Sequence, residues 1–323
     1  MATSSGTWST AHTGKGKFIA RLIEAMEKIG ATVTTNPDES VDVDLQITKK
    51  RYNAPNAKVK VVRVGPVTYD TRVSHSVMNA DTRTYMKQCD GIIYQSAFSK
   101  QACDSIIWKP KHDNWTICLN GADPEYYNAI EPFKVECKHL FLASTREWVW
   151  EKRLRDIIKA FKTAAIPDSN LYVLGRVWEK EKRFDPSQKK TKDKDIPGVR
   201  FLGECNDDTI AKLLRRANAL LHGVYIDACP NAVAEALCAG CPVIMCGCGG
   251  QFEMVDDDYR YACKQEWNFK PRDRRDQPPL AGDWMAEAMR QVIEQPPSID
   301  TSRVNINNIA EQYLSFFENL LCQ

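Results

Sequence analysis

Two carboxylates, Asp227 and Glu235, flank the N-terminus of a short predicted helix. Pro230 suits its first turn because proline has no N–H group to leave unpaired, and Gly240 followed by Pro242 suits its end. The N–H groups at a helix N-terminus bind anions, and nearby carboxylates accept hydrogen bonds from hydroxyl groups. The segment therefore suits a sugar nucleotide, with the diphosphate on the helix amides and the ribose and sugar hydroxyls on the two acids.

The same segment resembles the donor-binding signature of retaining glycosyltransferases of the GT-B fold, family 4 (the group 1 transferases). That signature has an acid, seven residues and a Glu, followed by Gly-x-Pro-Val and a Gly-Gly-x-x-Glu turn. The matching positions are Asp227, Glu235, Gly240, Pro242, Gly249, Gly250 and Glu253. The first acid of the family is usually Glu, so the shorter Asp227 bears on the preference for the donor sugar. An ordinary helix-to-strand connection in an α/β protein is the alternative interpretation.

The resemblance also implies roles for individual residues. Glu235 is expected to accept hydrogen bonds from both ribose hydroxyls, and Asp227 is expected to face the transferred sugar. Backbone amides at the start of the helix are expected near the phosphate and the sugar. The remaining donor-binding positions are Asn231, Ala232, Val233, Gly249 and Gly250.

Two cations follow the first predicted strand of the second half of the chain. The family places an Arg at this strand end and a Lys about six residues later, both on the donor diphosphate, and Arg146 and Lys152 match that spacing. Fixed cations would stabilise the negative charge that grows on the leaving group. With Asp227 they form the expected catalytic set, although surface charge is the alternative for both. Arg153 and Arg155 are expected to be solvated helix charges.

The first half of the chain offers weaker signals. Gly14 and Gly16 lie in an expected loop before a helix, and the resemblance implies that this loop lets the backbone approach the donor phosphate and the acceptor. Asp70 and His75 follow a predicted strand where the family has an acceptor-side polar residue. We expect them to contact the acceptor hydroxyl, with turn or surface positions as the alternative.

No metal or other cofactor is expected. The acidic run 256–258 has the pattern of a solvated turn, and the pairs Cys238/Cys241 and Cys246/Cys248 have zinc-like spacing but are expected to be small buried side chains. The resemblance implies a front-face retaining mechanism, in which the leaving phosphate helps to deprotonate the acceptor.

The composition is that of a globular protein with two domains. The chain has 323 residues, of which 43% are hydrophobic and 27% charged, and its net charge is +2. It contains no apolar run of about 20 residues and no apolar signal core near its N-terminus, so a cytoplasmic location is expected. Its twelve cysteines are accordingly expected to be reduced thiols.

Short apolar runs alternate with amphipathic segments along most of the chain. Strands are expected at 41–47, 59–64, 91–94, 117–119, 139–143, 171–175, 199–202, 219–222 and 243–245. Helices are expected within 13–29, after the loop with Gly14 and Gly16, and at 79–89, 150–164 and 304–321. Two further helices are expected, one capped by Asp207 or Asp208 and the other by Asp283.

This alternation predicts an α/β protein with parallel sheets. With the resemblance it implies the GT-B fold, in which two Rossmann-like domains face each other across a cleft. We expect an acceptor-side domain at 1–132, a donor-binding domain at 133–303 and a C-terminal helix at 304–323 that crosses back to the first domain.

The expected activity is transfer of a sugar from a nucleotide-diphosphate sugar to an acceptor hydroxyl. A UDP-sugar is the favoured donor. The acceptor is a glycan or, as the less favoured alternative, a hydroxymethylated base in DNA. Basic residues at 49–51, 58, 60 and 179–197 motivate that nucleic-acid alternative. A catalytically inactive protein that binds nucleotide sugars is the alternative from another class, and an epimerase would need an acid/base pair that we cannot assign.

Overall fold

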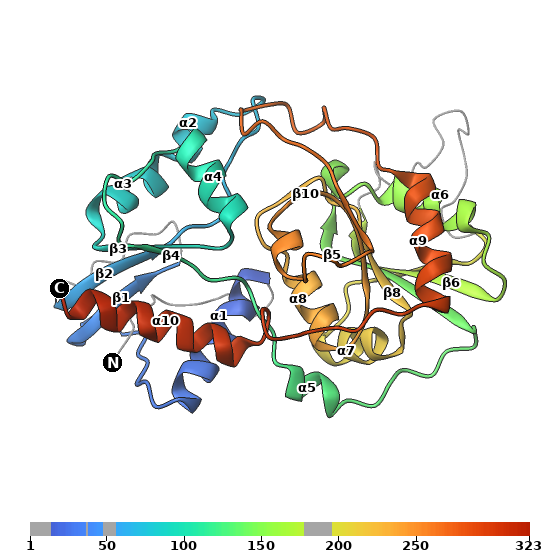
Figure 1. Ribbon diagram of the computed structural model, residues 1–323, viewed down its shortest axis with the longest axis horizontal. Coiled ribbons are helices and arrows are strands. Elements are labelled where there is room, and N and C mark those ends of the chain that lie inside the picture. The colour runs from blue at the N-terminus through green and yellow to red at the C-terminus, as the bar shows by residue number, and fades with distance from the viewer. Residues whose placement is uncertain (1–13, 37, 48–55, 178–195) are drawn as a thin grey trace.

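The computed structural model describes residues 14–36, 38–47, 56–177 and 196–323. Two α/β units lie side by side (Figure 1). The basic segment 49–51 lies outside the described residues, and so does the basic loop at 179–197 apart from its last two residues. No helix among the described residues is long and apolar enough to cross a membrane.

The first unit is built on a four-stranded parallel sheet with the order β1-β2-β3-β4. Its strands are β1 (Val41–Gln46), β2 (Ala57–Arg63), β3 (Gly91–Tyr94) and β4 (Trp115–Ile117). Its helices are α1 (Gly14–Lys28), α2 (His75–Met78), α3 (Ala80–Gln88) and α4 (Ala97–Ile106). α1 packs on one face of the sheet, and α3 and α4 on the other.

The second unit is built on a seven-stranded sheet in which β11-β10-β8-β5-β6-β7 is the main order and β9 pairs with β10. The strands are β5 (His139–Trp148), β6 (Ser169–Val177), β7 (Val199–Gly203), β8 (Ala219–His222), β9 (Ile226–Asp227), β10 (Val243–Gly249) and β11 (Ala262–Lys264). One face is covered by α6 (Leu154–Ala164) and α9 (Gly282–Glu294), and the other by α7 (Asp207–Arg216) and α8 (Asn231–Cys238). The short helix α5 (Pro124–Asn128) lies in the connection between the units.

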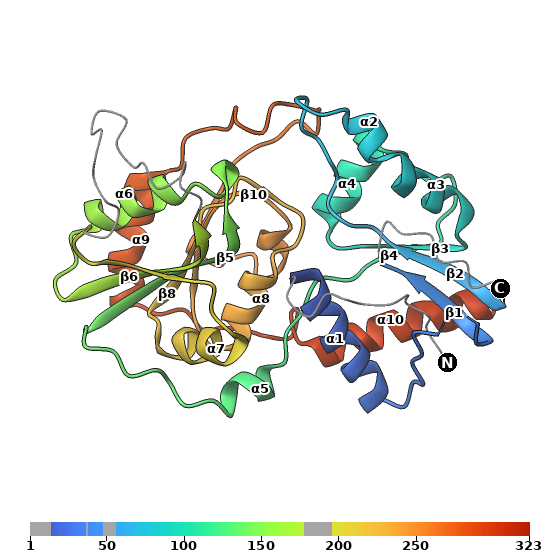
Figure 2. The same cartoon turned by 180° about the vertical axis from the view of Figure 1, so that it is seen from behind.

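The last helix returns to the first unit, as predicted. α10 (Ile306–Leu321) lies beside α1, as the reverse view shows (Figure 2). Its buried Ile309, Tyr313 and Phe317 share one apolar core with Phe18 and Leu22 of α1. The prediction of two parallel-sheet units joined by a C-terminal helix is confirmed. The expected boundary at residue 132 falls between β4 and β5.

Several predicted helix starts were misplaced by one or two residues. α7 is capped by Asn206, whose side chain accepts a hydrogen bond from the N–H of Thr209 at 2.8 Å, rather than by either of the two aspartates that follow. Asn is as effective an N-cap as Asp, so the sequence did not discriminate between neighbouring candidates. Pro230 is the N-cap of α8 instead of its first helical residue, and α9 begins before Asp283.

The prediction for Arg153 was wrong. A short 3-10 helix, η1 (Trp150–Lys152), precedes α6, and Arg153 joins the two with a left-handed backbone at φ 54°. Its side chain is buried, and its guanidinium donates to Gln265 at 2.9 Å and Gln277 at 3.1 Å. These two side-chain oxygens offset the cost of burying the cation, which a helical pattern alone does not reveal.

The cysteine pairs considered as zinc ligands are packing residues. Cys238, Cys241, Cys246 and Cys248 are all buried, and all twelve cysteines of the chain are free. In the part of the chain that the structure describes, no group of three or more His, Cys, Asp or Glu residues is arranged to hold a metal ion.

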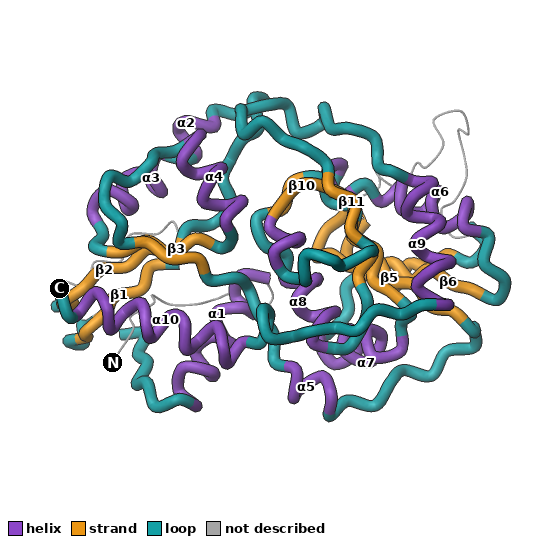
Figure 3. Tube along the Cα trace, viewed as in Figure 1, coloured by secondary structure: helices purple, strands orange, loops and turns teal. Residues whose placement is uncertain are grey.

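A long loop between β11 and α9 connects the second unit to the first (Figure 3). The N–H of Arg272 donates to the carbonyl of Tyr69 at 2.9 Å, and the N–H of Thr71 donates to the carbonyl of Arg272 at 3.1 Å. The polar stretch 270–279 therefore forms a backbone bridge to the segment that follows β2.

The strand predicted at 243–245 is longer than expected, because β10 continues to Gly249. A Cβ atom at Gly249 would lie 2.1 Å from the carbonyl oxygen of Asp227, and one at Gly250 would lie 2.0 Å from that of Ala228. Both glycines therefore allow β9, which carries Asp227, to lie directly against the end of β10.

Replacing Gly249 by Ala is expected to lower the free energy of unfolding by about 2 kcal/mol or more, because the new methyl group must displace the β9 backbone. Urea denaturation of the variant measures this loss. Gly282→Ala is the matched control, since a Cβ there meets nothing within 4 Å. Equal stability of the two variants would contradict the packing argument.

Candidate functional site

A cavity of about 870 Å³ lies between the two units and is lined by residues of both. Many of these residues stand at or just beyond the carboxyl ends of parallel strands, where ligands bind in open α/β sheets. The first unit contributes Lys17, Phe18, Arg63, Gly65, Pro66, Gln95 and Asn120. Polar residues of the second unit include Ser144, Thr145, Arg146, Lys152, His222, Asp227, Asn231 and Glu235.

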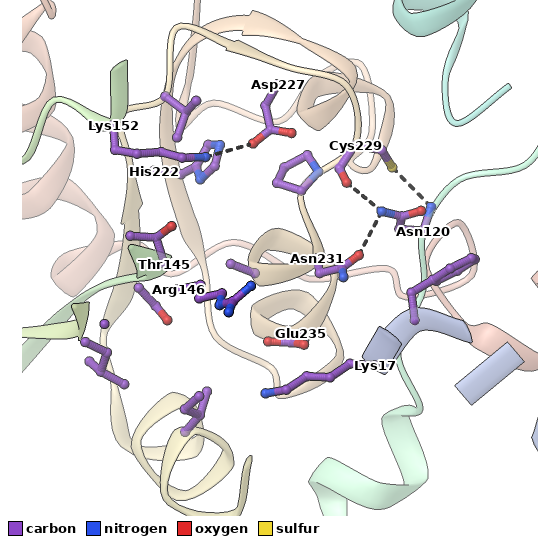
Figure 4. Close-up of a pocket in the computed structure, with 18 of the residues that line it drawn as sticks. Lys17, Asn120, Thr145, Arg146, Lys152, His222, Asp227, Cys229, Asn231 and Glu235 are labelled. Carbon is purple, nitrogen blue, oxygen red and sulfur yellow. Dashed lines mark hydrogen bonds and ion pairs between the residues drawn. The ribbon is translucent and has the colours of Figure 1, made fainter. Parts of the chain in front are cut away.

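The structure brings three of the predicted donor-binding residues, Asn231, Ala232 and Glu235, to this cavity, whereas Gly249 and Gly250 do not line it. Asn231, Ala232 and Glu235 line it from the first turns of α8 (Figure 4). The first N–H groups of a helix have no partner within the helix, so this end of α8 can donate to an anion. Val233 differs, because its side chain is buried in the core and its N–H donates to the carbonyl of Pro230 at 3.1 Å.

The three residues expected to be catalytic also line the cavity. Arg146 is exposed near the end of β5, and the described residues provide it with no ion-pair partner. Lys152 in η1 extends toward Asp227 of β9, with Nζ at 3.8 Å from Oδ2 (Figure 4). One cation is therefore available to a ligand, and the second is close to a carboxylate.

His222 lies beside Lys152 and Asp227, although the sequence analysis did not select it (Figure 4). Its imidazole is buried, and Nε2 has no hydrogen-bond partner among the described residues. Burial, together with a smaller effect of Lys152, lowers the pKa of His222 to about 4 against the opposing effect of Asp227. Its position as the last residue of a predicted strand was the available signal.

The pKa of His222 predicts a loss of stability in acid. Because the folded state disfavours the proton that the unfolded imidazole binds near pH 6.5, the free energy of unfolding should fall as the pH falls from about 6.5 toward 4. The expected loss from this group is about 2 kcal/mol between pH 7 and pH 5. Urea denaturation of the wild type and of His222→Gln measures it, and parallel pH profiles would contradict it.

Glu235 has a partner that the sequence analysis missed. Nη2 of Arg21, on α1, lies 2.8 Å from Oε1 of Glu235, and both side chains are largely buried. Lys17, one turn earlier on α1, forms a second ion pair with Asp207 at the start of α7. Both pairs join the two units across one edge of the cavity.

Asn120 forms a third connection between the units. Its Nδ2 donates to the carbonyl of Cys229 at 2.6 Å and to Oδ1 of Asn231 at 2.7 Å (Figure 4). Its Oδ1 accepts a hydrogen bond from Arg63. Sequence patterns placed a strand at 117–119 but gave no role to the side chain of Asn120.

The last acid of the signature binds to the first unit instead of lining the cavity. The carboxylate of Glu253 accepts from the N–H groups of Ala97 at 2.7 Å and Phe98 at 2.9 Å, at the start of α4. Next to it, Oγ of Ser96 donates to the carbonyl of Ala228 at 2.6 Å. These bonds hold α4 against the segment that carries Asp227.

The predicted acceptor residues are not brought to the cavity. The carboxylate of Asp70 lies 2.8 Å from Nη2 of Arg72 and 3.1 Å from Nε of Arg274, and the hydrogen bond from Arg72 lowers its pKa. These partners tie Asp70 to the 270–279 bridge. His75 begins α2, outside the cavity lining.

The glycines of the predicted N-terminal loop belong to a helix. Gly14 and Gly16 lie in the first turn of α1. Gly16 does not line the cavity, whereas Lys17, the next residue of α1, does.

Comparisons with known proteins agree with this geometry. Residues 130–272 match the family model described as Glycosyl transferases group 1, a region that covers most of the second unit. No curated protein sequence matches the chain. The group 1 match and the structures below support a glycosyltransferase.

Solved glycosyltransferase structures match almost the whole chain. AviGT4, a glycosyltransferase involved in avilamycin A biosynthesis, is 14% identical with a TM-score of 0.64, and the match covers 99% of this chain and 97% of that chain. Anabaena HepE in complex with UDP and glucose is 14% identical with a TM-score of 0.65 over 99% and 98%. Sucrose-phosphate synthase from Thermosynechococcus elongatus is 13% identical with a TM-score of 0.65 over 100% and 96%. These likenesses confirm the predicted GT-B fold.

Proposed function

We propose that the protein is a retaining glycosyltransferase of family 4 that moves a sugar from a UDP-sugar to an acceptor hydroxyl without a metal ion. The main support for this proposal is that one cavity between the two units is lined by Arg146, Lys152, Asp227, Glu235 and the N-terminus of α8. UDP is favoured because HepE, which shares the fold, has been solved with UDP and with UDP-glucose.

In this proposal different residues bind different parts of the donor. Arg146, Lys152 and the first turn of α8 bind the diphosphate, Glu235 binds the ribose, and Asp227 accepts a hydrogen bond from the sugar. The bond between the anomeric carbon and the phosphate oxygen breaks, and its electron pair goes to the phosphate. The acceptor oxygen attacks the same face of the sugar and loses its proton to the leaving phosphate. The fixed cations stabilise the charge that this cleavage places on the diphosphate.

A thermal-shift panel of UDP-, GDP- and ADP-sugars, with and without EDTA, tests the donor. A ligand at one hundred times its Kd stabilises the folded state by about 2.7 kcal/mol, so a shift of several degrees is expected for the UDP-sugar alone. The shift should survive EDTA. A shift for none of the three donors would overturn the assignment of the site.

Turnover separates an enzyme from an inactive binding protein. NMR of the product should show that the anomeric configuration of the donor is retained, and an inverted product would overturn the retaining mechanism. A donor-dependent thermal shift without transfer to any of a range of hydroxyl acceptors would favour the inactive alternative.

We propose a glycan acceptor in preference to a hydroxymethylated base in DNA. Of the basic residues that motivated the DNA alternative, Lys58 is paired with Asp42, with Nζ 2.8 Å from Oδ1. Gel shifts with duplex DNA at several salt concentrations test this preference. Binding at low salt that weakens steeply as salt increases would overturn it.

A further inference from the structure

Arg63 is a buried cation in the wall of the cavity that belongs to the first unit. It ends β2, is only 4% exposed and lines the cavity. Its guanidinium carbon lies 4.4 Å from the centre of the Phe18 ring, and its Nη2 donates to Oδ1 of Asn120. Its Nε is buried without a hydrogen-bond partner among the described residues.

No carboxylate of the described residues pairs with Arg63. The two lysines that line the cavity differ from Arg63, since Lys17 pairs with Asp207 and Lys152 lies near Asp227. Residues 1–13, which precede α1, contain no Asp or Glu. An unpaired charge is costly to bury, and a neutral donor would suffice to satisfy Oδ1 of Asn120. The charge of Arg63 therefore calls for an anion that the described chain does not provide.

The position of Arg63 indicates which substrate would bring this anion. Under the proposed function, the donor occupies residues of the second unit, namely Arg146, Lys152 and Asp227. Arg63 lies on the opposite wall with Gln95, whose Nε2 donates to the carbonyl of Val64 at 2.8 Å. The Oε1 of Gln95 can then accept from a ligand hydroxyl. This wall suits a polyhydroxylated molecule that carries one negative group.

We propose that the acceptor is an anionic sugar or polyol, and that Arg63 binds its phosphate or carboxylate group. The inference rests on the proposed function, because that function assigns the cavity residues of the second unit to the donor. A planar guanidinium can form two parallel hydrogen bonds with either kind of oxyanion, so the two sources share one chemistry.

Calorimetry on the protein saturated with UDP tests the proposal with three matched hexoses. UDP occupies the donor side, so that glucose 6-phosphate, glucuronate and glucose report on the remaining wall. At constant ionic strength, at least one of the two anionic hexoses is expected to bind ten or more times more tightly than glucose. Preference for glucose 6-phosphate would identify a phosphate group, and preference for glucuronate would identify a carboxylate group. Equal binding of all three, or no binding of any, would overturn the proposal.

Substitutions locate the effect. Arg63→Met should abolish the preference for the anionic hexose. Arg63→Lys should keep part of it, because lysine retains the positive charge but lacks the planar guanidinium that forms two parallel hydrogen bonds. Arg303→Met is the control, since Arg303 is exposed and pairs with Asp256 outside the cavity. A preference that persists in Arg63→Met would overturn the role of Arg63, and if that variant does not fold, the Arg63→Lys comparison decides.

The titration with UDP alone separates the two levels of the argument. If UDP does not bind, the proposed function fails, and the acceptor inference falls with it. If UDP binds but the hexoses do not differ, the donor site stands and only the inference about the acceptor is overturned.

Discussion

Replacing Arg146 by Met is expected to lower kcat/KM for the donor by about 10²–10³-fold, comparable to the loss of one preorganised donor that stabilises transition-state charge. Arg146 is the cavity cation that is exposed and has no ion-pair partner among the described residues, so its guanidinium is available to the diphosphate. Its removal leaves no buried charge uncompensated, and the free energy of unfolding should change by no more than about 0.5 kcal/mol. Steady-state kinetics and urea denaturation measure the two quantities.

Arg200→Met is the matched control for this substitution. Arg200 is a largely exposed arginine on β7 of the same sheet and does not line the cavity. Its replacement should leave both kcat/KM and stability nearly unchanged. Unchanged kinetics in Arg146→Met, or a loss of activity that parallels a loss of stability, would contradict direct contact with the leaving group.

The elements with strong local patterns could be predicted from the sequence. The strands at 91–94 and 219–222 were predicted at their observed bounds, because buried runs of apolar residues end there in polar or turn residues. The α1 and α10 helices were recognisable from their apolar faces, which meet in one core. The start of α7 differed from expectation because adjacent residues could each cap that helix.

The donor half of the site was predictable for a related reason. Asp227 and Glu235 lie in one continuous segment with the helix N-terminus between them, so local spacing alone brings them to one place. The acceptor half has no such continuity. Asp70 follows the right strand, but its carboxylate is paired with Arg274, more than 200 positions away in the chain.

The residues that were missed depend on contacts between elements that are far apart in the chain. Arg21 lies on an amphipathic helix whose pattern predicts only a polar position, and its partner Glu235 is 214 positions away. Arg63 ends a strand and is buried only because α1 and α10 cover that face of the sheet. Local periodicity gives the direction of a side chain relative to its own element, but it does not identify the charge that a distant element places opposite.

The Arg21–Glu235 ion pair allows the two roles of Glu235 to be separated. Glu235→Ala is expected to weaken UDP binding at least tenfold, because the ribose loses a charged hydrogen-bond acceptor. It should also lower the free energy of unfolding by about 2 kcal/mol, because Arg21 is left largely buried without its carboxylate. Calorimetry with UDP and urea denaturation measure the two effects.

Arg21→Met provides the comparison, because it breaks the same ion pair and leaves Glu235 in place. It should also lower stability, but it should bind UDP at least as tightly as the wild type, since Oε1 of Glu235 becomes available to the ribose. The double variant should recover part of the lost stability without recovering UDP binding, because removing both partners leaves no unpaired charge. If Arg21→Met weakens UDP binding as much as Glu235→Ala does, Glu235 acts by holding the two units together and not by binding the ribose.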